Sequence, residues 1–148
     1  MQTRFTSCFT SGTPNADINL EGMARFPFPC QFVSLNLLHV NIPFDFPIVA
    51  ESGWISLTVT GGSTNLLVVN GNRYNYTWLL PFEPGGLTGN FQWFTQAGAG
   101  GDDLHHMTHF TPNLNISVSF VTAAGLAALP PTTVGRLCSL EIGVRPKL

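Results

Sequence analysis

Charged side chains are scarce in this chain. Asp, Glu, Lys and Arg together make up 9% of its 148 residues, against about 25% in ordinary soluble domains. The six basic residues include one lysine, Lys147, and they are scattered along the sequence. A site for nucleic acid needs clustered Lys and Arg side chains. We therefore expect no direct binding of nucleic acid.

Long apolar runs and paired cysteines are also absent. No apolar run approaches the roughly 18 residues of a membrane span, and the first ten residues, MQTRFTSCFT, lack the apolar segment of a signal peptide. The three cysteines, Cys8, Cys30 and Cys138, are far apart and form no C-x-x-C pair. We expect reduced thiols, with Cys138 on the apolar face of a strand, and synthesis in a reducing cytosol. A mature chain that had lost its signal peptide would look the same.

Motifs for catalysis are missing too. No G-x-S-x-G nucleophile motif occurs, and a single lysine near the end of the chain provides neither a P-loop nor a Schiff base. Any two of the eight acids could form a carboxylate pair, so that signal carries no information. We expect no catalytic residue and no cofactor, and therefore a protein that is not an enzyme.

Alternation of apolar and polar residues is the signal that recurs instead. Side chains that alternate in this way place one set in a core and the other toward solvent or a neighbour, as in a β-strand. Two shorter apolar runs, Asn65–Asn70 and Asn90–Thr95, also suit strands. The alternating segments are Val33–Leu37, Ile55–Thr60, Tyr74–Leu80, Leu114–Phe120 and Cys138–Val144.

Turn residues divide these segments. The pair Asn70-Gly71 stands between two strand-like runs and predicts a tight hairpin, because Asn and Gly accept positive φ. Gly61-Gly62 marks another turn, and proline-rich stretches mark loops. No helical pattern of ten or more residues occurs, since the best attempt, Thr122–Leu129, is short and contains a glycine. Seven or eight strands without an internal repeat indicate an all-β, antiparallel β-sandwich.

The chain divides into two parts by composition. Residues 1–25 are rich in Thr, Ser, Gly and Asn and have few apolar residues, so we expect an N-terminal arm that is partly disordered or ordered at an interface. We expect residues 26–148 to form a single sandwich domain. Because charged groups are depleted in interface cores, we expect much of the surface to be covered by other copies of the chain. A monomer solvated by hydroxyl and amide groups is the alternative.

Three of the four histidines lie in one stretch, GAGGDDLHHMTH. His105 and His109 have the i, i+4 spacing of a zinc-binding helix, but no glutamate lies between them and four residues rich in glycine precede them. We expect a polar loop between strands. Two alternatives stay open for His105, His106 and His109: a metal site, and a contact between subunits that responds to pH.

The aromatic residues offer one further possibility. Trp54, Trp93 and Tyr74 could stack on sugar rings, as in a lectin. Phe and Trp in a sandwich belong more often to the core or to an interface, and we expect that role for them.

From residue 32 onward, the order of the expected strands and turns resembles that of the single jelly-roll structural proteins of non-enveloped viruses. These include penton-type minor capsid proteins and spike or fibre-head domains. The resemblance is carried by "FVSLNLLHVNIPFDFPIV", then "GWISLTVTGG", then "NLLVVNGNRYNYTWLLPF". It lies in the Ile-Pro turn and in the step from Gly71 to Tyr74 into the next strand, and it covers residues 30–148.

The resemblance implies a jelly roll of about eight strands in a structural viral protein. Such a protein would be made in the host cytoplasm and would assemble in the virion as a trimer or pentamer with other capsid proteins, in contact with a host receptor or glycan. The N-terminus has only Arg4 and Arg25 where genome-packaging shells carry a basic arm, which favours a minor capsid, spike or decorating protein. A carbohydrate-binding sandwich and a trimeric head of the tumour-necrosis-factor or complement type are the alternatives.

Overall fold

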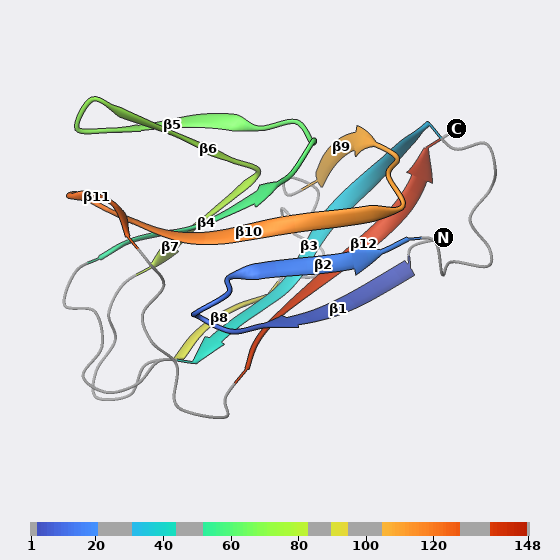
Figure 1. The fold of residues 1–148 in the computed structure, drawn as a ribbon, viewed down its shortest axis with the longest axis horizontal. Coiled ribbons are helices and arrows are strands. Elements are labelled where there is room, and N and C mark those ends of the chain that lie inside the picture. The colour runs from blue at the N-terminus through green and yellow to red at the C-terminus, as the bar shows by residue number, and fades with distance from the viewer. Residues whose placement is uncertain are drawn as a thin grey trace.

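The computed structural model describes residues 3–20, 31–43, 52–82, 90–94, 105–127 and 137–147, which form twelve β-strands and no helix (Figure 1). The expectation of an all-β protein is confirmed. The strands are β1 (Thr3–Phe9), β2 (Asn15–Asn19), β3 (Phe32–Pro43), β4 (Gly53–Val59), β5 (Asn65–Val69), β6 (Asn72–Tyr76), β7 (Trp78–Phe82), β8 (Asn90–Phe94), β9 (His105–His109), β10 (Asn113–Thr122), β11 (Gly125–Ala127) and β12 (Cys138–Lys147).

The strands form two five-stranded antiparallel sheets and one separate hairpin. The first sheet has the order β1-β12-β3, and both β8 and β9 pair with the remaining edge of β3. The second sheet has the order β11-β10-β4-β7, and β2 also pairs with β10. The two sheets pack against each other as a β-sandwich, whereas β5 and β6 pair only with each other.

The pairing of eight strands is nested. β1 pairs with β12, β2 with β10, β3 with β9 and β4 with β7, so the outer strands of the chain pair together and so do the inner ones. The pairings of β12 with β3 and of β10 with β4 then join these four pairs into the two sheets. The first and last strands of the chain are therefore neighbours.

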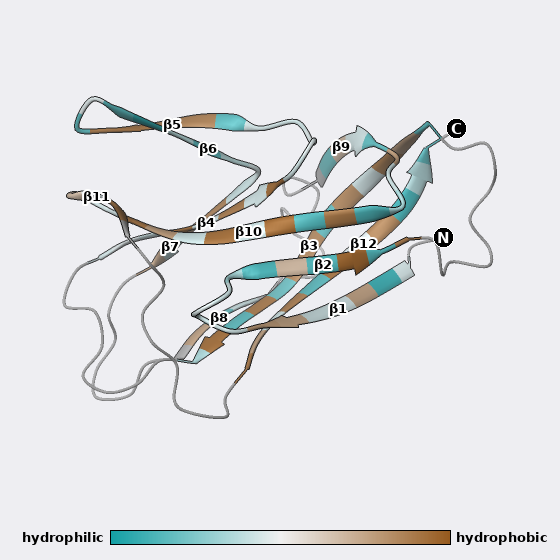
Figure 2. Cartoon of the chain, viewed as in Figure 1, coloured by the Kyte–Doolittle hydropathy of each residue, from teal (hydrophilic) through white to brown (hydrophobic). Residues whose placement is uncertain are grey.

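The core lies between the sheets and follows the alternation of the sequence. In β10, Leu114, Ile116, Val118 and Phe120 are buried, and polar residues separate them (Figure 2). Such burial is worth about 1.5–3 kcal/mol for each large apolar side chain. The other alternating segments also supply core residues, and these come from both sheets. They are Val33, Leu35 and Leu37, Ile55, Leu57 and Val59, Trp78 and Leu80, Cys138, Leu140, Ile142 and Val144.

The predicted hairpin at Asn70-Gly71 is confirmed. Both residues have positive φ, 49° at Asn70 and 81° at Gly71, as a tight turn between twisted strands requires. The hairpin of β5 and β6 lies over the outer face of the second sheet. The hydroxyl of Thr58 in β4 donates a hydrogen bond to the carbonyl oxygen of Asn75 in β6 over 2.9 Å.

The run Tyr74–Leu80, expected as one strand, is divided at Thr77, so that expectation is wrong. The backbone N–H of Thr77 donates to the carbonyl oxygen of Leu57 over 2.7 Å, and its hydroxyl accepts from the N–H of Val59 over 3.0 Å. Thr77 itself is buried. These two bonds hold the chain at the edge of β4 as it passes from the hairpin back into the sheet as β7.

The arm expected at residues 1–25 is corrected by the structure, which places residues 3–20 within the sandwich. All seven residues of β1 pair with β12, and β2 pairs with five residues of β10. Phe9, Ile18 and Leu20 are buried in the core. Few apolar residues suffice here because an edge strand buries only alternate side chains of one face. Residues 21–25 lie outside the described part of the chain.

Candidate functional site

The histidine-rich stretch does not form a loop over its described part. Residues 105–109 form β9, which pairs with residues 32–36 of β3. The alternation of a strand then separates the side chains: His106 and Thr108 point into the sandwich, and Met107 and His109 point outward. The expected loop is wrong for these five residues, and the upstream residues 98–104 lie outside the described part.

His106 lies between the two sheets. Its imidazole meets the indole ring of Trp78 edge-on, with the ring centroids 5.6 Å apart. Burial lowers the pKa of His106 below its usual 6.5, and a hydrogen bond with the backbone of Thr77 opposes that shift. The imidazole is therefore neutral near pH 7 and acts as part of the packing between the layers.

His39 and His109 do not form a cluster with His106. His109 is exposed and its ring packs on that of Phe32, with the centroids 4.7 Å apart. His39 lies in β3, level with Glu141 of β12. Among the residues that the structure describes, no group of three or more His, Cys, Asp or Glu side chains is arranged to hold a metal ion.

The two described cysteines are free and lie on opposite faces of the first sheet. Cys8 is exposed in β1, and Cys138 is buried in β12, as predicted for its apolar face. Burial raises the pKa of the Cys138 thiol to about 11. Because the thiolate is the nucleophilic form, Cys138 is an inert core residue at neutral pH. Cys30 lies outside the described residues.

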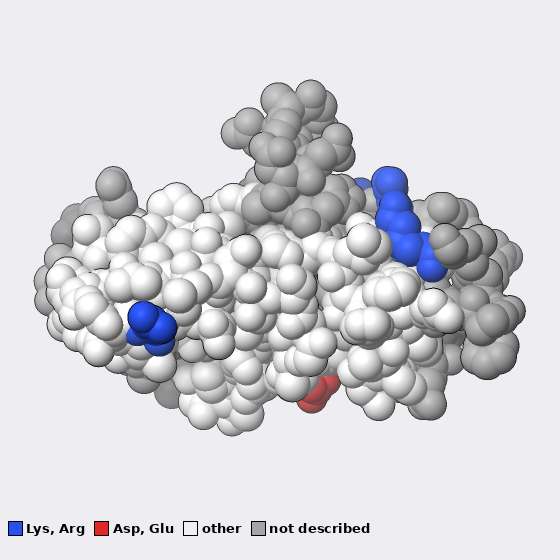
Figure 3. All heavy atoms as spheres, turned by 90° about the horizontal axis from the view of Figure 1, so that it is seen from above, with Lys and Arg blue, Asp and Glu red and all other residues white. Residues whose placement is uncertain are grey.

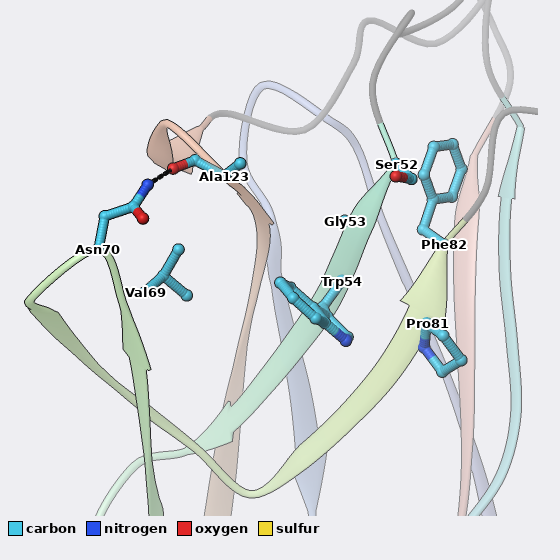
Figure 4. Close-up of a pocket in the computed structure, with 8 residues that line it drawn as sticks. All are labelled: Ser52, Gly53, Trp54, Val69, Asn70, Pro81, Phe82 and Ala123. Carbon is cyan, nitrogen blue, oxygen red and sulfur yellow. Dashed lines mark hydrogen bonds between the residues drawn. The ribbon is translucent and has the colours of Figure 1, made fainter.

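A cavity of about 400 Å³ lies beside the tip of the β5–β6 hairpin (Figure 4). The hairpin supplies Val69 and Asn70, and the second sheet supplies the remaining side. The indole of Trp54 lies between Val69 and Pro81 in this view. The described residues that line it carry no charge: Ser52, Gly53, Trp54, Val69, Asn70, Pro81, Phe82 and Ala123.

Two contacts hold the hairpin in place beside this cavity. The side-chain nitrogen of Asn70 donates a hydrogen bond to the carbonyl oxygen of Ala123 in the β10–β11 turn. The hydroxyl of Tyr74 accepts a hydrogen bond from the N–H of Leu126 over 3.2 Å. Gly125 allows this approach, because a Cβ atom there would lie 2.7 Å from the Tyr74 hydroxyl.

A second cavity of about 340 Å³ lies between β9 and the turn that follows β4. Met107 is exposed there, and Phe32 and His109 stack on each other at its wall. The turn of the chain after β4 closes the other side. The residues that line it are Phe32, Gly61, Gly62, Ser63, Met107, Thr108 and His109.

The aromatic residues that the sequence suggested for sugar stacking do not meet in one site. Trp54 lines the cavity beside the hairpin, whereas Trp93 lies in β8 of the other sheet and packs against the core. Tyr74 packs from the hairpin onto β11. Sequence reasoning singled out Trp54 but missed Asn70 and Pro81 as its neighbours, because three separate segments bring them together.

Charged side chains are few on the described surface. Figure 3 shows one face on which they lie far apart. Over the six described ranges the cations are Arg4, Arg73, Arg145 and Lys147, and the anions are Asp17 and Glu141. Arg4 and Glu141 form an ion pair of 3.5 Å on the first sheet. No helix of the described residues is long and apolar enough to cross a membrane.

No family model, no curated protein and no solved structure matches the chain.

Proposed function

We propose that the chain is a structural viral protein, a minor capsid, spike or decorating protein, that assembles with copies of itself through a jelly-roll domain. The scarcity of charged side chains on the described exterior of the sandwich is the observation that carries this proposal. A solitary domain of this size usually relies on a net-charged, mixed-sign surface for solubility. A surface of hydroxyl, amide and apolar groups suits contact with other subunits, because interface cores are depleted of charge.

The nested strand pairing supports the jelly-roll part of the proposal. A jelly roll has eight strands in two sheets and two Greek keys. With β5, β6, β8 and β11 set aside as additions, the eight remaining strands pair from the outermost inward, and β12 and β10 each join a second pair. The resemblance to viral single jelly-roll proteins is a separate argument from strand order and composition.

Exposed apolar side chains support the assembly part. Leu66 and Val68 point outward from β5 and are 54% and 57% exposed. Leu126 on the neighbouring β11 is 59% exposed. A neutral surface that also presents large apolar side chains is typical of a protein-binding face.

Electron microscopy of the purified chain tests the proposal. Assembly around a closed axis predicts particles with three-fold or five-fold symmetry in class averages. Separate, featureless single domains at every protein concentration would contradict it. Co-purification with other capsid proteins from infected cells would support the capsid role specifically.

A further inference from the structure

The cavity beside the hairpin tip combines the indole ring of Trp54, an apolar wall and two uncharged polar side chains. Trp54 is partly exposed, and no ring contact of its indole occurs among the described residues. Pro81 and Val69 flank it, and Ser52 and Asn70 lie at the rim (Figure 4). The volume of about 400 Å³ lies in the range of small-molecule sites.

We propose that this cavity binds a neutral saccharide, with one sugar ring stacked on the indole of Trp54. The face of an aromatic ring is negative, so it attracts the polarised C–H groups on the face of a pyranose ring. The hydroxyl groups at the ring edge need neutral donors and acceptors, which the amide and the hydroxyl at the rim supply. None of the described lining residues carries a charge that would pair with a carboxylate, a phosphate or an ammonium group.

The orientation of the Asn70 amide strengthens this assignment. Its nitrogen is directed to the carbonyl oxygen of Ala123, so its oxygen is turned away from that bond (Figure 4). An amide oxygen has two acceptor positions, which a sugar hydroxyl can fill. The hydrogen bond to Ala123 holds this amide at the hairpin tip. The acceptor is thus in place before any ligand arrives.

The second cavity is a weaker candidate for the same chemistry. Its two aromatic rings, Phe32 and His109, pack on each other with a tilt of 34°. A ring that is already stacked offers less free face to a sugar. The cavity at Trp54 differs in that the indole ring has no such partner among the described residues.

The proposal does not depend on assembly, because one chain supplies every described residue of the lining. Failure to bind sugar would leave the structural role intact, and a monomeric chain could still bind sugar. The two inferences are therefore tested separately.

The experiment measures binding of methyl glycosides of neutral hexoses and N-acetylhexosamines by calorimetry and by tryptophan fluorescence, with sialyllactose as the charged comparison. We expect a neutral glycoside to bind and to change the fluorescence. Trp54→Ala lowers the affinity by about tenfold or more, since stacking is lost. Trp54→Phe keeps most of the affinity in calorimetry and loses the fluorescence response. Trp93→Phe is the matched control and retains both.

Asn70→Gly is the second test, because glycine keeps the positive φ of the turn and removes only the amide. We expect it to weaken binding while circular dichroism stays that of the parent chain. The proposal is overturned if no neutral glycoside binds, or if Trp54→Ala and Asn70→Gly both leave the affinity unchanged in folded protein. Binding of sialyllactose alone, or of apolar fluorescent dyes that no sugar displaces, also overturns it.

Discussion

The imidazole of His106 and the indole of Trp78 meet at 90° in the interior, one from each sheet of the sandwich. This contact joins β9 to β7, and it turns a histidine that the sequence placed in a polar loop into a packing residue. Trp78 is 1% exposed, so the environment of the imidazole excludes much of the water that would solvate its charge.

Acid should therefore destabilise the fold through His106. Its pKa is lowered in the folded state, so below the ordinary pKa of 6.5 the unfolded chain binds a proton that the folded chain does not. Stability is unaffected at high pH and falls as the pH drops through 6.5 toward the lower folded value. Urea unfolding at pH 8 and pH 5 measures the loss. His106→Phe, which keeps an aromatic ring and cannot be protonated, should lose less stability, and His109→Gln serves as the exposed control. Equal pH dependence of His106→Phe and the parent would contradict this reading.

The hydroxyl of Thr77 should contribute to stability through its bond with the N–H of Val59. Thr77→Val removes the acceptor and leaves that N–H buried without its partner, which costs about 1–3 kcal/mol. Thr77→Ser retains the hydroxyl and should lose much less. Chemical unfolding measures the stability of both variants. If Thr77→Val were as stable as the parent chain, the hydrogen bond would make no such contribution to stability.

Removal of residues 1–10 should destroy the cooperative fold. The deletion takes away β1, exposes the edge of β12 and removes Phe9 from the core. Thermal unfolding followed by circular dichroism reports the result, with a chain lacking only residues 1 and 2 as the control. A truncated chain that melts like the parent would restore the interpretation of this segment as an arm.

The turn at Asn70 should tolerate glycine better than alanine. Both substitutions remove the bond to Ala123, but only alanine meets the steric cost of positive φ, about 1–2 kcal/mol. The difference between the melting curves of Asn70→Ala and Asn70→Gly isolates that cost. Equal stabilities would mean that the turn relaxes to another conformation.

Strands with two distinct faces could be predicted from the sequence. In Leu114–Phe120 each apolar residue is buried and each polar one is not fully buried, so the period of two is sufficient. The Asn70-Gly71 turn was predictable for a similar reason, because Asn and Gly readily accept the positive φ angles that the turn requires. Both signals are local, and both are confirmed.

The errors arise where the partner of a residue is distant in the sequence. β1 has hydroxyl residues between its few apolar ones, and its strand structure depends on β12 at the other end of the chain. β9 turns His106 and Thr108 inward because Trp78 and Val33 provide their surroundings. The cavity at Trp54 follows the same rule, since Asn70 and Ala123 are joined only by tertiary structure.

The mass of the unmodified chain in solution, measured by light scattering over a range of dilutions, tests the central claim most directly. If the neutral surface is covered by copies of the chain, the mass will be three or five times the 16.0 kDa of one chain and will persist on dilution. The substitution Val68→Lys, which places a charge on the exposed face of β5, should then reduce the mass in solution. Thr6→Lys on the other sheet is the matched control and should leave the mass unchanged. A well-behaved species of 16.0 kDa at every concentration would contradict the account.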